Sequence, residues 1–248
     1  MIGIFDSGSG GLTVLKALRA ELPSADVVYF GDIANAPYGS KSRAELSRLT
    51  AGAFQLLKAQ GVNKIISACN SVSASLAVSL YDAFSIAPGA LIEMVGPTVS
   101  YFKGSKARIG LCATPATIDS GIYQDAFRMM GIEITSIAIS DLAGAIEFGG
   151  DTDAIIQNTF STNPTDFDVL ILACTHYPLA IDVFKKALPG VMIFDPAAAV
   201  AERARAQFWP QEVGDGTTRF IISKDSEIFR GFVAQLFPEE KVTIEVQV

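Results

Sequence analysis

Short apolar runs alternate with longer amphipathic segments along the chain, a pattern typical of strands that alternate with helices. In the first part of the sequence, apolar runs predict strands at residues 2–5, 27–30, 64–68 and 90–95. Apolar residues at helical spacing predict helices at residues 12–21, 42–60 and 73–84, and Gly96-Pro97 is expected to break the fourth strand. Strands in this order pair in parallel through right-handed crossovers, so the pattern predicts a parallel α/β sheet.

The order of strand, polar turn and helix restarts after residues 101–105. It predicts a strand around Cys112 and strands at 132–137, 169–173 and 192–194, with helices at 118–130, 141–149, 152–160, 179–188 and 197–207. A strand, a helix and a strand at 219–223, 226–236 and 242–248 come too late for this second repeat, and we expect them to return to the first. The predicted fold is therefore α/β, with two similar parallel-sheet domains related by pseudo-symmetry and an active site in the cleft between them. The first domain comprises residues 1–96 and 208–248, and the second residues 97–207.

Two cysteines occupy equivalent places in the repeats. The segments KIISACNSVSASLA and VLILACTHYPLAID align on Ala-Cys, and each places a cysteine, Cys69 or Cys174, directly after an apolar strand. The carboxyl ends of parallel strands are where open α/β sheets bind ligands. We therefore expect the two thiols to face one site, whereas Cys112 lies inside a strand and is expected to fill the core.

Two proton-transferring groups on opposite sides of a carbon can remove a proton from one face and return one to the other, which inverts the stereocentre. A thiol suits this role because its ordinary pKa, about 8.5, leaves some thiolate at neutral pH. Asp6 is expected beside Cys69, and His176, the single histidine, beside Cys174, with Glu147 as the carboxylate that holds the imidazole. Hydroxyl and amide donors for a substrate carboxylate follow the strands at Ser7, Asn70, Ser71, Thr114, Thr117 and Thr175.

Two loops in the first part of the chain indicate ligand binding. The glycine-rich turn at residues 6–11 lies between a strand and a helix, where free amide groups and the helix dipole favour a carboxylate or a phosphate. It is not a dinucleotide fingerprint, because its glycines have another spacing, and it lacks the lysine of a P-loop. The loop at residues 35–40, which contains Pro37, Tyr38 and Gly39, is expected either to offer backbone donors to a ligand or to be held in place by Tyr38 as an anchor.

Composition narrows the class of partner. A net charge of −7 argues against nucleic acid, and one histidine without a Cys-x-x-Cys pair argues against a metal site. No signal sequence or apolar run of membrane-spanning length is recognised, so we expect a cytoplasmic protein with reduced thiols and a small-molecule substrate.

The sequence resembles a known family. The blocks GIFDSGSGGLTVLKAL, NAPYGSKS, ACNSVSAS and ACTHYPL are similar to the signatures of the cofactor-independent glutamate racemases, in the aspartate/glutamate racemase superfamily. The resemblance implies that Cys69 and Cys174 are the catalytic acid/bases, assisted by Asp6 and His176. It implies a homodimer that interconverts L- and D-glutamate for peptidoglycan synthesis without metal or other cofactor. The substrate-binding residues expected are Asp6, Ser7, Pro37, Tyr38, Gly39, Asn70, Ser71, Thr114, Thr117, Thr175 and His176.

Three other functions stay open at this point. A racemase of the same superfamily could act on aspartate or a related acidic substrate. A cysteine-dependent hydrolase could use Cys174 with His176, although this reading gives no role to Cys69. A two-domain module could bind an acidic amino acid without turnover, although binding alone does not require two thiols.

Overall fold

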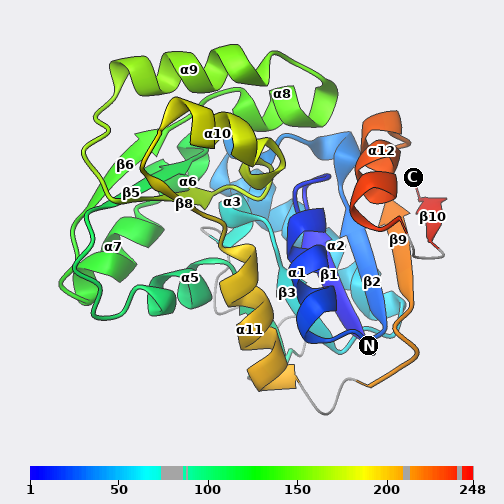
Figure 1. Cartoon of the computed structure of the whole chain (residues 1–248). Coiled ribbons are helices and arrows are strands. Elements are labelled where there is room, and N and C mark those ends of the chain that lie inside the picture. Colours follow the sequence, from blue (N-terminus) through cyan, green and yellow to red (C-terminus); the bar gives the residue numbers. More distant parts are fainter. Residues whose placement is uncertain (74–85, 88, 209–212, 239–241, 248) are drawn as a thin grey trace.

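The computed structural model describes residues 1–73, 86–87, 89–208, 213–238 and 242–247. Within this part of the chain the strands form two separate parallel sheets, each flanked by helices (Figure 1). The predicted α/β fold with two parallel-sheet units is therefore confirmed.

The first lobe contains a six-stranded sheet in the order β10-β9-β2-β1-β3-β4. Its strands are β1 (Ile2–Asp6), β2 (Val27–Gly31), β3 (Lys64–Ser67), β4 (Leu91–Glu93), β9 (Thr218–Ile222) and β10 (Thr243–Val246). Its helices are α1 (Leu12–Glu21), α2 (Arg43–Ala59), α3 (Asn70–Ser73) and α12 (Glu227–Leu236). Ile4 and Tyr29 enter one core cluster and their neighbours Phe5 and Phe30 another, so both faces of this sheet are buried.

The second lobe contains a four-stranded sheet in the order β6-β5-β7-β8. Its strands are β5 (Ile109–Ala113), β6 (Ile134–Ala138), β7 (Val169–Ala173) and β8 (Met192–Phe194). Its helices are α6 (Pro115–Asp119), α7 (Ile122–Met129), α8 (Leu142–Phe148), α9 (Thr152–Thr162) and α10 (Ile181–Ala187). Cys112 of β5 is fully buried in the core with Leu170 and Leu172, as predicted for a core residue.

Two further helices, α5 (Val95–Tyr101) and α11 (Ala197–Phe208), lie where the lobes meet (Figure 1). Helix α11 belongs to both cores, because Val200 packs in a cluster of the first lobe and the adjacent Ala199 in a cluster of the second. The division of the chain into residues 1–96 with 208–248 and residues 97–207 stays a prediction, and α11 contacts both of its parts.

Several elements differ from their predicted extents, and one predicted helix falls outside the described residues. Gly96 and Pro97 lie within the first turn of α5, where proline is tolerated because that turn has no internal acceptors for its N–H groups. The helix predicted at 118–130 is two helices, separated at Gly121, whose φ of 70° is left-handed. The helix predicted at 73–84 lies outside the described residues, except for Ser73 at the end of α3.

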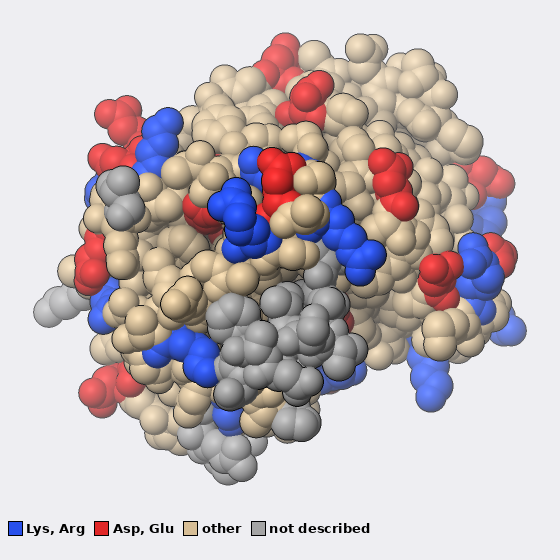
Figure 2. Space-filling model, turned by 180° about the vertical axis from the view of Figure 1, so that it is seen from behind, with Lys and Arg blue, Asp and Glu red and all other residues tan. Residues whose placement is uncertain are grey.

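Two features bear on binding to nucleic acid and to membranes: the distribution of surface charge, and the length and apolar character of the helices. On the face seen in Figure 2, the described Lys and Arg side chains lie beside Asp and Glu side chains and do not form a continuous basic surface. Among the described residues, no helix combines the length and the apolar character that crossing a bilayer requires.

Candidate active site

The predicted site residues gather where strand ends of the two sheets meet. Asp6 ends β1, Cys69 follows β3 by two residues, and Cys174 comes directly after β7. All three side chains are buried, as are Ser7, Asn70, Ser71, Thr114, Thr117, Glu147, Thr175 and His176. Asp6, Cys69 and Cys174 lie there because a buried apolar strand ends and polar residues follow, which is the signal available in the sequence. Thr117 and Glu147 come instead from helices α6 and α8.

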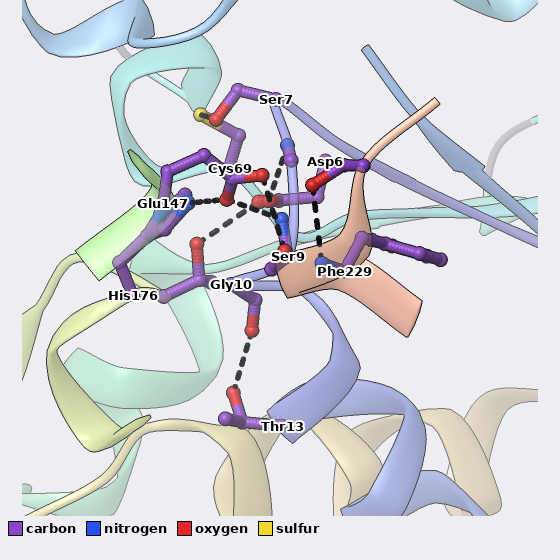
Figure 3. A network of polar contacts seen from close by, with 12 residues as sticks. Asp6, Ser7, Ser9, Gly10, Thr13, Cys69, Glu147, His176 and Phe229 are labelled. Carbon is purple, nitrogen blue, oxygen red and sulfur yellow. Dashed lines mark hydrogen bonds and ion pairs between the residues drawn. The ribbon is translucent and has the colours of Figure 1, made fainter. Parts of the chain in front are cut away.

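The glycine-rich turn after β1 lies directly against the second lobe (Figure 3). A Cβ at Gly8 would lie 2.5 Å from Glu147 Oε2, and one at Gly10 would lie 2.6 Å from Thr175 Oγ1. Glycine is required at these positions because any side chain would push the lobes apart. In the structure the amides of the turn donate to carboxylates of the protein itself: Gly8 N–H to Asp6 Oδ1 at 3.0 Å and Ser9 N–H to Glu147 Oε2 at 2.7 Å. Binding of a ligand anion by this turn stays a prediction.

Cys69 belongs to the first lobe and lies on that lobe's side of the site. Its thiol donates to Ser7 Oγ at 3.9 Å (Figure 3). Burial raises the pKa of this thiol, and the negative charges of Asp6 and Cys174 raise it further. Cys69 therefore holds its proton. Asp6, the residue before Ser7, accepts a hydrogen bond from Thr175, the residue after Cys174, and this contact brings the ends of the two cysteine-bearing strands together.

His176 is the partner of Cys174 in the second lobe. Its Nε2 lies 2.7 Å from Glu147 Oε2, and its ring interacts with Cys174, two residues earlier in the same turn. Burial by itself lowers the pKa of the imidazole, but the hydrogen bonds to Cys174 and Glu147 and their charges outweigh it, and the net pKa is raised well above its usual value. The imidazole is thus a cation at neutral pH, and a cation beside a thiol favours the thiolate.

Asp6 contacts residues of both lobes. Its Oδ2 accepts a hydrogen bond from Thr175 Oγ1 at 2.9 Å, and its carboxylate interacts with the charge of His176. Burial raises the pKa of Asp6, while the charge of His176 and the bonds from Gly8 and Thr175 oppose this rise. A buried carboxylate of this kind is suited to a cationic group such as a substrate ammonium.

Asn70 presents an unused donor in the site. Tyr123 of α7 donates from its hydroxyl to Asn70 Oδ1 at 2.6 Å, and both side chains are buried. The Nδ2 of Asn70 is buried and has no hydrogen-bond partner among the described residues. A buried donor without a partner costs free energy, which a ligand oxygen would recover. Tyr123 was not among the predicted site residues, because nothing in its local sequence pattern distinguishes it from a core aromatic.

Three hydroxyl groups form a cluster across the lobes. Ser71 Oγ lies 3.0 Å from Thr114 Oγ1 and 3.4 Å from Thr117 Oγ1, and the two threonine oxygens are 3.2 Å apart. Because a hydroxyl can both donate and accept, this cluster can turn its donors toward a carboxylate.

The loop with Pro37, Tyr38 and Gly39 lies beside this cluster. A Cβ at Gly39 would come within 2.5 Å of Thr114, so the loop of the first lobe touches the second there. Pro37, Gly39 and Thr114 line a cavity of about 490 Å³ together with residues 139–145. Tyr38 is buried and donates to Asp32 Oδ2 at 2.6 Å, so its hydroxyl anchors the loop.

The structure thus brings together all the residues predicted for the site and adds Ser9 and Tyr123. Ser9 is fully buried and donates twice to Glu147, and its only signal in the sequence is a polar residue between glycines. Among the described residues no group of three or more His, Cys, Asp or Glu side chains could hold a metal ion.

Known proteins are similar to this chain in sequence and in fold. The family model described as Asp/Glu/Hydantoin racemase matches residues 12–204. A glutamate racemase of Aquifex aeolicus is 36% identical over 99% of this chain and 98% of its own length. The structure is similar to that of a glutamate racemase from Francisella tularensis in complex with D-glutamate, with a TM-score of 0.86, 31% identity, and coverage of 100% of this chain and 97% of that one. It is also similar to the glutamate racemase isoform RacE1 of Bacillus anthracis, with a TM-score of 0.87 and 26% identity. That match covers 100% of this chain and 97% of the other. The chain therefore belongs to the Asp/Glu/Hydantoin racemase family.

Proposed function

We propose that this chain is a glutamate racemase that interconverts L- and D-glutamate by two-base proton transfer at the α-carbon, with Cys69 and Cys174 as the bases. The observation that carries the proposal is the pair of buried thiols from different lobes in one site, each with its own assisting side chain. The glutamate racemases to which the chain is similar over nearly its whole length support the reaction and the substrate.

The two thiols have different surroundings. His176 lies on the Cys174 side of the site, whereas burial and the charge of Asp6 raise the pKa of the Cys69 thiol. In one direction, the Cys174 thiolate takes the α-proton and the Cys69 thiol gives its proton to the opposite face of the carbon. In the reverse direction the two exchange roles, so each turnover moves one proton on and one proton off. Positioned acid–base groups contribute about 10²–10⁴-fold to such a step.

The α-proton of an amino acid is much less acidic than a thiol, so the developing negative charge also needs stabilisation. The unpartnered Nδ2 of Asn70 and the hydroxyl cluster of Ser71, Thr114 and Thr117 are donors that can hold the substrate carboxylates. Asp6 is placed to accept from the substrate ammonium. Ser7, Thr175 and the backbone of residues 37–39 complete the proposed binding site.

The resemblance to glutamate racemases also supports proposals on context. We propose that the enzyme uses no metal or organic cofactor, acts in the cytoplasm, supplies D-glutamate for peptidoglycan, and works as a homodimer. Sedimentation analysis of the purified protein tests the last point.

The test is racemisation of L-glutamate in heavy water without added cofactor, followed by chiral chromatography and mass spectrometry. We expect solvent deuterium at the α-carbon and loss of racemisation in both Cys69→Ala and Cys174→Ala. Cys112→Ala is the matched control and should keep its activity, because Cys112 packs in the core.

Full activity in either site variant would reject the two-base assignment. Turnover of aspartate but not glutamate would change the substrate and leave the mechanism standing. A covalent acyl-enzyme at Cys174 would favour the hydrolase, and saturable binding of glutamate without turnover would favour a binding module.

A further inference from the structure

We propose that Ser9 is a positioning residue that, through Glu147, keeps His176 in its cationic form on the Cys174 side of the site. The inference rests on the proposed function for its catalytic consequence, although its structural part can be measured without turnover.

Ser9 of the first lobe holds the Glu147 carboxylate of the second lobe with two donors. Its backbone N–H donates to Oε2 at 2.7 Å and its hydroxyl to Oε1 at 3.1 Å (Figure 3). The same Oε2 accepts from His176 Nε2 at 2.7 Å. Ser9, Glu147 and His176 therefore form a chain of hydrogen bonds between the lobes, and each of the three residues is at least 97% buried.

The burial of this chain makes the donors of Ser9 important. In a site with little water, a carboxylate beside an imidazole can exist as an ion pair or as a neutral pair in which the proton has moved to the carboxylate. Hydrogen bonds to the carboxylate stabilise its charged form, and those to charged groups are the stronger ones. The two donors of Ser9 consequently favour the ion pair and the imidazolium.

Through Glu147 and His176, the two donors of Ser9 act on the Cys174 thiol and not on the Cys69 thiol. His176 follows Cys174 by two residues and interacts with it, whereas Cys69 contacts Ser7, two residues before Ser9 in the first-lobe turn. One turn of the first lobe thus supplies one hydroxyl to each side of the site. Ser7 contacts its cysteine directly, and Ser9 acts through two side chains of the opposite lobe.

The single histidine of the chain makes a direct test possible. In protein with ¹⁵N-labelled histidine, the two ring nitrogens of His176 report whether the ring is an imidazolium or a neutral imidazole. We expect the imidazolium pattern at neutral pH in the unmodified protein and a shift toward the neutral pattern in Ser9→Ala, which keeps the backbone donor but loses the hydroxyl.

Two further variants serve as references, one that removes the carboxylate charge and one matched control. Glu147→Gln removes the anion and should give the neutral pattern. Thr13→Ala is the matched control, because its hydroxyl donates at 3.0 Å to the Gly10 carbonyl of the same turn and touches neither cysteine. Its histidine signals should stay those of the unmodified protein.

Activity gives the second readout. Ser9→Ala should lower kcat/KM for glutamate by about tenfold, the low end of the effect of one hydrogen bond to a charged group. Unchanged histidine signals in Ser9→Ala would overturn the inference even if activity fell, because a loss of stability alone does not change the protonation of His176. If the histidine signals change as expected but neither the unmodified protein nor any variant racemises glutamate, the proposed function is rejected. The role of Ser9 toward His176 then still stands.

Discussion

Glu147 joins the two lobes through buried hydrogen bonds. It accepts from Ser9 twice and from His176 once, and its approach to the first lobe is possible only because Gly8 has no side chain. Its charge is also one of the reasons why the pKa of His176 is raised. The charge state of the site at a given pH therefore depends on this one carboxylate.

The pH dependence of the rate tests this role. In the unmodified enzyme the imidazolium exists below the raised pKa of His176 and is lost as the pH rises through that value. Glu147→Gln removes two of the interactions that raise it, so the cation is lost at a lower pH. We expect the alkaline limb of the kcat/KM profile to move to lower pH, with a loss of more than about tenfold at pH 8.

The exposed Glu133 of the same lobe provides the control, because Glu133→Gln removes the same charge away from the site. An alkaline limb that stays in place in Glu147→Gln would show that the ionisation of His176 does not limit the rate.

At the scale of elements, the turn between β1 and α1 decides how closely the lobes approach. Its amides and hydroxyls bind Asp6 and Glu147, and its glycines leave room for Thr175 and His176. The turn is thus a contact surface between lobes as much as a connection between two elements.

Gly10→Ala is expected to disturb this contact. The added Cβ would lie 2.7 Å from both the backbone nitrogen and Nδ1 of His176, so the second lobe must move away. A displacement of this kind misaligns the two thiols on either side of the substrate, and we expect a loss of about 100-fold in kcat.

Gly52→Ala is the matched control for this substitution. Gly52 lies in α2 with nothing within 4 Å of an added Cβ. Alanine there should leave kcat unchanged and raise the free energy of unfolding by about 0.5–1 kcal/mol, because glycine is unfavourable within a helix. Equal activity in both variants, measured by the racemisation assay, would show that the contact at Gly10 is not needed for catalysis.

At the scale of the whole molecule, α11 ties the two lobes together. It follows β8 of the second sheet, packs against α1 of the first lobe, and places Val200 and Ala199 in different cores. Because its apolar side chains belong to both cores, neither lobe can lose its packing without affecting the other.

Val200→Ala should therefore destabilise the chain as one unit. Val200 is fully buried, and the loss of two methyl groups with the cavity they leave should cost about 2 kcal/mol. Urea unfolding followed by far-UV circular dichroism should show one transition, moved to lower urea, while Glu202→Ala on the exposed side of α11 should change little. Two separate transitions in the unmodified protein would contradict the shared core.

The sequence by itself determined the strands and the chemistry that follows them. Ile65 and Ile66 of β3 and the whole run Val169–Ala173 are apolar because these strands are buried on both faces, and a short apolar run bounded by polar residues is typical of such strands. A cysteine at the end of each strand, together with the rule that ligands bind at the carboxyl ends of parallel strands, predicted a shared site for the two thiols. Asp6, Glu147 and His176 were candidate neighbours of these thiols, and the sequence alone did not establish their contacts.

Only the tertiary structure decided which atoms meet between the lobes. Ser9 and Glu147 are 138 positions apart, and Tyr123 and Asn70 are 53 apart, so no local pattern relates them. The break expected at Gly96-Pro97 turned out to be a helix start, because a proline in the first turn and a proline after a strand look alike in sequence. Local patterns report what a residue needs from its own element, whereas contacts between elements depend on how the two lobes pack, and that packing holds the imidazole in its charged form.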